Sequence, residues 1–243
     1  MSGYTFGDFE KTVAALLGEN GCPWDKSQTF ESLREDLLEE CYESVDAVNK
    51  GDAESLREEL GDVMLTVMLY AKISEKNGGF TINEIINGVT EKIIRRHSHV
   101  FGDKRAVTPE ESLANWDAEK RAEKGFVNQT ERLADVPRAL PALMRAQKIL
   151  KRAAGSDVIK NKSCARAEEL AGLAAKIGDR VLSGAGDDLP ELIGGILLCI
   201  AEISRFFEIN AELALTNSAE KFINVFANAE NVAMVAFDAY HNL

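Results

Sequence analysis

Two short acidic motifs lie close together in the sequence, EExxE at residues 39–43 and EExxD at residues 58–62. Side chains three positions apart lie about one turn from each other on the same face of a helix. Each motif therefore predicts a pair of carboxylates that can hold a hard divalent cation. The four candidate metal ligands are Glu40, Glu43, Glu59 and Asp62.

The candidate ligands are all carboxylates, and an all-oxygen set favours Mg²⁺, with Mn²⁺ also possible, over zinc. The Glu-x-x-His pairs of carboxylate-bridged iron bundles are missing. The four acids border apolar stripes, where like charges repel and lose hydration, and a bound cation would offset that cost. The alternative is a solvated helix surface, because charged helix faces commonly just meet water.

Apolar residues around the acids recur at helical spacing and predict two antiparallel helices. The first is expected over about 30–49, with Thr29 as its cap and Lys50-Gly51-Asp52 as its end. The second is expected over about 53–76. Because the connection is short, the helices should be neighbours and their acid pairs should face each other. The stripes expected to be buried are Leu33, Leu37, Cys41, Val45 and Val48, then Leu56, Leu60, Val63 and Val67.

A further helix is expected over about 82–95, and its end is strongly basic, with Lys92, Arg95 and Arg96. Arginine forks and lysine bind phosphate oxygens. Basic residues at a helix end can instead simply stabilise its negative pole, but beside a metal site the phosphate interpretation is favoured. The apolar residues expected to point inward are Ile85, Ile86, Val89, Ile93 and Ile94.

Two histidines and two tryptophans are weaker candidates for chemistry. His97 and His99 lack a third ligand nearby, so packing or capping is favoured over metal binding. Trp24 and Trp116 can stack on a base, although tryptophans more often anchor a core. The phosphate-binding loop, the dinucleotide-binding glycine motif and the Gly-x-Ser-x-Gly elbow are all missing, which argues against those three enzyme classes.

The rest of the chain also predicts helices and no strand. A short helix at residues 4–17 is followed by a turn at 21–25, and a charged helix is expected at 110–124. A linker should occupy about 125–140. A second helical region should begin near Ala139, break near Gly155 and at 183–186, and continue over 189–207 and 211–237. The sequence therefore predicts an all-α protein with two helical units.

Composition limits the partners of the chain. It has 243 residues with 45% hydrophobic residues and a formal net charge of −12, which argues against binding to nucleic-acid polymers or anionic membranes. The four cysteines are scattered, so reduced thiols are expected. No export signal is visible, and the longest apolar run is shorter than a membrane span. We expect a cytoplasmic protein.

The acidic motifs and their flanks resemble those of a known family. EExxE with ExxD is similar to the signature of the all-α nucleoside triphosphate pyrophosphohydrolases. The segments Cys22-Pro23-Trp24-Asp25-Lys26-x-Gln28-Thr29 and Arg95-Arg96-His97-x-His99-Val100-Phe101 resemble the MazG branch specifically. The similarity also includes residues 137–151, so that it covers most of the chain.

This resemblance implies Mg²⁺-dependent hydrolysis of nucleoside triphosphates to monophosphate and pyrophosphate, in an intertwined helical homodimer. It implies that the four acids are metal ligands and that Lys92, Arg96 and Trp116 contact the nucleotide. Arg95 is an additional candidate for holding phosphate. We expect Glu39 to position or deprotonate the attacking water, because it adjoins the ligands and has no coordination role.

The family pattern also implies that the second half repeats the first, and here the sequence departs from it. Gly172 stands where the last acid of EExxE is expected, and Gly194 stands where the aspartate of ExxD is expected. Each acid pair has lost one member, and a tryptophan matching Trp116 is missing. We therefore expect a catalytic domain at 1–124, a linker at 125–140, and a degenerate, structural second domain at 141–243.

Two alternatives remain open on the sequence. One is a hydrolase of the same kind narrowed to a single deoxynucleotide or phosphoribosyl nucleotide. The other is a helical interaction module whose acids only keep the bundle soluble.

Overall fold

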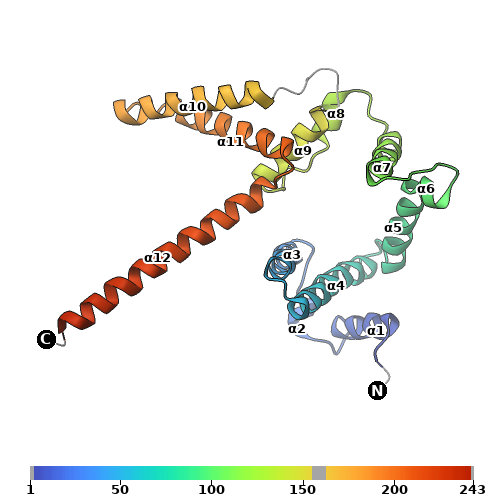
Figure 1. The fold of residues 1–243 in the computed structure, drawn as a ribbon. Helices are drawn as coiled ribbons and strands as arrows, with labels where there is room; N and C mark the ends of the chain where they lie inside the picture. Colours follow the sequence, from blue (N-terminus) through green and yellow to red (C-terminus); the bar gives the residue numbers. More distant parts are fainter. Residues whose placement is uncertain (1–2, 155–162, 242–243) are drawn as a thin grey trace. The chain divides into compact units, whose positions relative to one another are not determined.

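The computed structural model describes residues 3–154 and 163–241, and over these residues the chain is helical without strands (Figure 1). This confirms the predicted all-α class. The chain divides into two compact units, Met1–Glu123 and Lys124–Leu243. Within the described residues, none of the helices combines the length and the apolar character that crossing a membrane requires.

The N-terminal unit contains seven helices in the part of the chain that is described. The two longest, α3 and α4, pack along each other and carry the acidic motifs. The helices are α1 (Phe6–Leu16), α2 (Pro23–Lys26), α3 (Leu33–Lys50), α4 (Ala53–Lys76), α5 (Ile82–Arg96), α6 (Ser98–Phe101) and α7 (Pro109–Lys124).

The connection between α3 and α4 explains why these helices are antiparallel neighbours. Gly51 ends α3 in the left-handed region with φ 71°, a conformation that glycine adopts without a steric penalty. The Asp52 carboxylate then accepts hydrogen bonds from the backbone N–H groups of Glu54 and Ser55, both at 3.1 Å, which caps α4. The predicted antiparallel pair is therefore confirmed, with α4 at its predicted bounds.

Two local predictions on the N-terminal side of α3 are wrong. The helix begins at Leu33 rather than near residue 30, because Thr29 lies in a preceding turn in which its hydroxyl accepts a hydrogen bond from the Ser32 N–H at 3.2 Å. Residues 21–25, predicted as a turn, contain the start of the one-turn helix α2. Pro23 occupies its first position, where a missing N–H costs nothing.

The core of the N-terminal unit lies among α1, α3, α4 and the start of α5. Its buried side chains are Val13, Leu33, Met68, Leu69, Ala71 and Ile82. Lys72 on α4 reaches Glu10 on α1 at 2.7 Å and Glu75 at 2.8 Å, which ties α1 to the α3–α4 pair. The core thus holds the antiparallel pair rigidly at the end away from the acids.

The apolar stripes predicted to be buried are only partly buried in the structure of the single chain. On α5, Ile82 is buried and Ile85 is half-buried, but the residues further along are 40% to 47% exposed. The prediction that they point inward is wrong for this chain, because α5 packs on α4 near their connection and no described helix covers the rest. The exposed members of the stripes are Cys41, Val45, Val48, Leu60, Ile86, Val89, Ile93 and Ile94.

The C-terminal unit is built around α11, which packs against both α9 and α10. Its helices in the described residues are α8 (Gln129–Ala134), α9 (Ala142–Ala154), α10 (Ser163–Ser183), α11 (Leu189–Phe206) and α12 (Ala211–His241). The break predicted near Gly155 lies outside the described residues. The break predicted at 183–186 is confirmed by Gly184, which has φ 72°.

The segment predicted as a linker is partly folded onto the C-terminal unit. Asn128 caps α8 by accepting a hydrogen bond from the Glu131 N–H at 2.9 Å, and Val136 is only 1% exposed. Gln129 donates to the Arg152 carbonyl at 2.7 Å, which joins α8 to the end of α9. Residues 129–136 therefore belong to the packed unit rather than to a free connection.

The ion pairs of Asp135 predict that the stability of the C-terminal unit depends on pH. Lys124 at 3.0 Å and Arg152 at 3.3 Å hold the pKa of Asp135 below its usual value. A lowered folded-state pKa gives stability that is present above the unfolded pKa and is lost as the pH falls through the folded one. We expect Asp135→Asn to lower the melting temperature near neutral pH, and the difference from the wild type to vanish once the pH falls below the folded-state pKa of Asp135. Thermal melts across this range check it, and a difference that persists in acid would contradict it.

Candidate functional site

Three acids meet where α3 and α4 run side by side. Glu40 and Glu43 on α3 and Glu59 on α4 each place a carboxylate oxygen within 4.8 Å of the others. Glu40 and Glu59 are half-buried, whereas Glu43 is exposed. The sequence spacing and the short connection at Gly51 together bring these side chains to one place, as the two-helix arrangement predicts.

The electrostatics of this acidic cluster follow from crowding of like charges. Burial raises the pKa of Glu40, and repulsion by Asp62, Glu43, Glu59 and Glu39 raises it further. Burial also raises the pKa of Glu59, followed by repulsion from Glu43 and a hydrogen bond with the Glu43 side chain. The site therefore disfavours three free negative charges.

Asp62 and Glu39 stand at the edge of this cluster. The half-buried Asp62 is not one of the three acids whose oxygens meet, although its charge is the second cause of the raised Glu40 pKa. Glu39 is exposed and acts on Glu40 only through its charge. The structure therefore brings together three of the four predicted ligands, with the fourth close enough to repel them.

The arrangement fits a hard divalent cation. Oxygens bound to one Mg²⁺ at about 2.1 Å lie at most about 4.2 Å apart, so the 4.8 Å spread needs only small side-chain rotations. Within the described residues, none of the four carboxylates forms an ion pair with a lysine or arginine. A cation would satisfy charges that the protein itself leaves unneutralised.

The predicted phosphate-binding residues form a second cluster between α5 and α7. Arg96 is 7% exposed, its Nε donates to Glu123 Oε2 at 2.9 Å, and its Nη2 forms an ion pair with the same oxygen at 2.8 Å. Arg95 reaches the other oxygen of Glu123 at 3.1 Å. The Arg96 guanidinium also lies 5.2 Å from the centre of the Trp116 ring. Glu123 thus fixes both arginines and, through Arg96, the tryptophan.

Two histidines complete this cluster by packing. His97 donates from Nδ1 to the Ile93 carbonyl at 2.8 Å, and its ring meets Trp116 edge-on at 4.8 Å. The His99 ring lies 5.6 Å from that of His97. Together with Ser112 and Leu113, His97, His99 and Trp116 line a pocket of about 390 Å³. Its walls are mostly apolar, which suits the flat face of a ring rather than a phosphate.

Lys92 differs from the two arginines. It lies one turn before Arg96 on α5, is half-buried, and forms no ion pair with a described residue. Its ammonium therefore lies outside the ion pairs with Glu123 that hold Arg95 and Arg96.

Sequence reasoning missed Glu123, although a signal exists. Trp116 and Glu123 lie seven residues apart on one helix, which places both on the same face after two turns. That spacing predicts that one partner can touch both. The partner itself, Arg96, lies on another helix and is identified only by the tertiary structure.

In the C-terminal unit, Glu169 of the segment Glu168-Glu169-x-x-Gly172 has a basic partner. Arg166 on α10 donates from Nη1 to Glu169, three residues further on, and from Nε to Glu202 on α11 at 2.7 Å. Glu202 is buried, and Glu191 is exposed. The Arg166 guanidinium therefore supplies positive charge beside Glu169 and Glu202, where a metal ion would otherwise have to supply it. Arg166 is a further residue that the motif comparison missed.

Comparison with known proteins agrees with this geometry. The family model of the MazG nucleotide pyrophosphohydrolase domain matches residues 28–101, the segment that holds the acidic cluster and Lys92, Arg95 and Arg96. The nucleoside triphosphate pyrophosphohydrolase of Escherichia coli K12 is 39% identical over 221 residues, covering 88% of this chain and 82% of that protein.

Two further relatives match nearly the whole chain. The nucleoside triphosphate pyrophosphohydrolase/pyrophosphatase MazG of Thermotoga maritima is 35% identical over 237 residues, covering 95% of this chain and 88% of its own. The uncharacterized protein YabN of Bacillus subtilis is 38% identical over 231 residues, but the chain spans only 47% of its length. The chain therefore belongs to the MazG family of nucleotide pyrophosphohydrolases, which are hydrolases.

Proposed function

We propose that the N-terminal unit hydrolyses nucleoside triphosphates to the monophosphate and pyrophosphate with Mg²⁺, or alternatively Mn²⁺, bound at the acidic cluster. The observation that carries this proposal is the meeting of Glu40, Glu43 and Glu59 without a basic partner. Asp62 would act as the fourth ligand. Bound there, the ion would neutralise the triphosphate and lower the pKa of an attacking water.

The side chains around the cluster have separate roles in this proposal. Glu39, exposed and beside the ligands, would accept a hydrogen bond from the water that attacks the α-phosphorus, and then its proton. Lys92 would hold a phosphate oxygen, and charge that develops during bond cleavage would be stabilised by Lys92 with Arg95 and Arg96. Trp116 and the pocket beside it would contact the base.

A product assay tests the proposed reaction. The four ribonucleoside and four deoxyribonucleoside triphosphates are each incubated with the full chain, and pyrophosphate and orthophosphate are measured separately. We expect pyrophosphate release that requires Mg²⁺ and stops with EDTA. Release of orthophosphate alone, or turnover unaffected by EDTA, would contradict the proposal. Turnover of a single nucleotide would narrow its specificity without changing the reaction.

The two units are expected to respond differently to the loss of a corresponding acid. Glu40→Ala should lower turnover by about 100-fold or more, because it removes a metal ligand. Glu169→Ala should leave turnover within about twofold, because Glu169 is already paired with Arg166 and Gly172 stands in place of the acid three residues further on. Steady-state assays of both variants make the comparison. A loss in Glu169→Ala as large as that in Glu40→Ala would show that the second unit is catalytic.

We also propose that the chain works as a homodimer. The apolar side chains along α3 and α5 that one chain leaves exposed support this, since Val45, Val48, Ile86, Val89 and Ile94 would be covered by a second copy. Light scattering after size-exclusion chromatography should give twice the chain mass. Val89→Glu should shift the wild-type mass toward that of one chain, and a monomeric wild type would contradict the proposal.

A further inference from the structure

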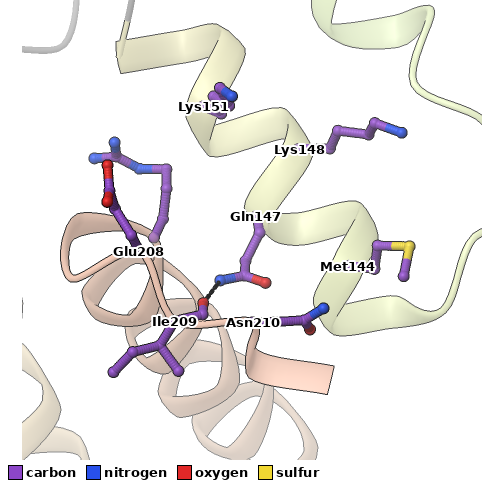
Figure 2. Close-up of a pocket in the computed structure, with 8 residues that line it drawn as sticks. Met144, Gln147, Lys148, Lys151, Glu208, Ile209 and Asn210 are labelled. Atoms are coloured by element: carbon purple, nitrogen blue, oxygen red, sulfur yellow. Dashed lines mark hydrogen bonds between the residues drawn. The ribbon is translucent and has the colours of Figure 1, made fainter. Parts of the chain in front are cut away.

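An open pocket of about 560 Å³ lies in the C-terminal unit, between α9 and the turn that joins α11 to α12 (Figure 2). The residues that line it do not belong to the acidic motifs. Its volume falls in the range of small-molecule sites, about 300–1,000 Å³.

The wall formed by the α11–α12 turn is held in place by backbone and side-chain hydrogen bonds. After α11 ends, Glu208 adopts a left-handed conformation with φ 56°, and the Ile209 N–H donates back to the Ser204 carbonyl at 2.8 Å. Gln147 on α9 donates to the Ile209 carbonyl at 2.7 Å and accepts from the Ala211 N–H at 3.1 Å. Figure 2 shows the first of these two bonds. The turn is thereby fixed to α9, so the pocket is preformed.

The lining is basic although the chain as a whole is acidic. Lys148 and Lys151 extend from α9 (Figure 2), and Arg205 near the end of α11 is the third cation of the lining. The lining has one carboxylate, that of Glu208. The formal net charge of the chain is −12, so three cations around one pocket stand out from their surroundings. Both lysines are exposed, and their flexible stems allow the ammonium groups to turn onto a ligand.

Other groups that line the pocket also bear on which ligand it can bind. The side-chain oxygen Oδ1 of Asn210 accepts from the Leu213 N–H at 3.1 Å at the start of α12, so the side-chain NH2 group of Asn210 points away from that N–H. The positive end of the α12 dipole also lies here. Met144 and Ile209 give the pocket apolar wall as well. These features together suit an anion with several oxygens.

We propose that this pocket binds a small molecule that carries two or more phosphate groups, and does not hydrolyse it. The single carboxylate of the lining cannot provide the several oxygens that Mg²⁺ takes from a protein and a phosphate chain. The eroded acidic motif on α10 does not contribute to the lining. This binding is separate from the reaction proposed for the N-terminal unit.

Isothermal titration calorimetry of the full chain in EDTA tests this site, with inorganic pyrophosphate and a non-hydrolysable ATP analogue as the two probes. Without metal, the acidic cluster repels polyphosphates, so heat should come from the basic pocket. We expect one site per chain, with affinity lowered about tenfold in Lys148→Gln and in Lys151→Gln and affinity falling with salt. Binding of pyrophosphate alone would identify the phosphates as the whole recognised group, and tighter binding of the analogue would add the nucleoside.

Matched controls separate the pocket from general charge. Lys176→Gln removes an exposed lysine of α10, outside the pocket, and should leave the affinity unchanged, while Lys148→Arg should retain it. Glu43→Gln should lose turnover yet keep this binding. The proposal would be overturned if the wild type did not bind, if Lys148→Gln and Lys151→Gln kept the wild-type affinity, or if Lys176→Gln lost as much affinity as they do, whatever the outcome of the activity assay.

Discussion

Glu43→Gln is expected to reduce Mg²⁺-dependent pyrophosphate release by at least about 100-fold. Glutamine keeps the shape of the side chain but replaces a carboxylate oxygen with a neutral amide oxygen, a much weaker ligand for a hard cation. Glu43 meets both Glu40 and Glu59 in the acidic cluster, so its charge serves both sides of the site. Steady-state kinetics over a range of Mg²⁺ concentrations measures the loss.

Although Glu43→Gln should lower activity, it should not lower the stability of the metal-free protein. Repulsion from Glu43 raises the pKa of both Glu40 and Glu59, which means that the three negative charges oppose folding when no cation is bound. Removing one charge should leave the metal-free melting temperature unchanged or higher. Activity lost together with a higher metal-free melting temperature would identify a site that sacrifices stability for metal binding.

Glu58→Gln is the matched control for this experiment. Glu58 adjoins Glu59 on α4 but is exposed and lies outside the cluster. The substitution makes the same chemical change at the neighbour of Glu59, so turnover should stay within about twofold of the wild type. Retained activity in Glu43→Gln, or an equal loss in Glu58→Gln, would show that the acidic cluster is not the metal site.

Arg96→Ala is expected to lower both turnover, by about tenfold or more, and the melting temperature, by several degrees. The structure shows Arg96 buried between Glu123 and Trp116, with a hydrogen bond from Nε and an ion-pair contact from Nη2 to the same carboxylate oxygen. Its loss would leave Glu123 without its main partner and release the Trp116 ring. We therefore expect a mixed effect rather than the pure loss of a phosphate contact.

Arg95→Ala provides the comparison, because Arg95 contacts the same glutamate but its side chain is about half exposed. It should change the melting temperature little. To follow Trp116 alone, its fluorescence can be recorded in a Trp24→Phe background. We expect a changed spectrum and a raised KM in Arg96→Ala, and an intermediate result in Arg96→Lys, which keeps the charge but not the fork. An unchanged spectrum with only kcat reduced would instead favour direct contact of Arg96 with phosphate.

In the C-terminal unit, Glu169 has a basic partner within the protein. Where the N-terminal unit leaves its carboxylates unpaired, Arg166 joins Glu169 to the buried Glu202 across α10 and α11. In this triad one guanidinium offsets part of the charge of two carboxylates. The basic pocket beside α9 lies elsewhere in this unit.

Local signals in the sequence determined much of the N-terminal unit. Helical periodicity, the glycine at position 51 and the acidic cap that follows it define the α3–α4 pair, and they place Glu40, Glu43 and Glu59 at one height along it. These features depend on residues within a few turns of each other, so the sequence is sufficient to predict them. The start of α3 was misplaced because Thr29 and Ser32 satisfy each other in a turn before the helix.

Only the tertiary structure decided which partners the charged residues have and which apolar faces are covered. Arg96 with Glu123 is a contact between residues 27 apart, and Arg166 with Glu202 between residues 36 apart. The exposed face of α5 follows equally from where other helices lie, as does the basic pocket formed by α9 and the α11–α12 turn. Periodicity identifies the face of a helix, but what covers that face or neutralises its charges depends on segments distant in sequence, which local patterns do not encode.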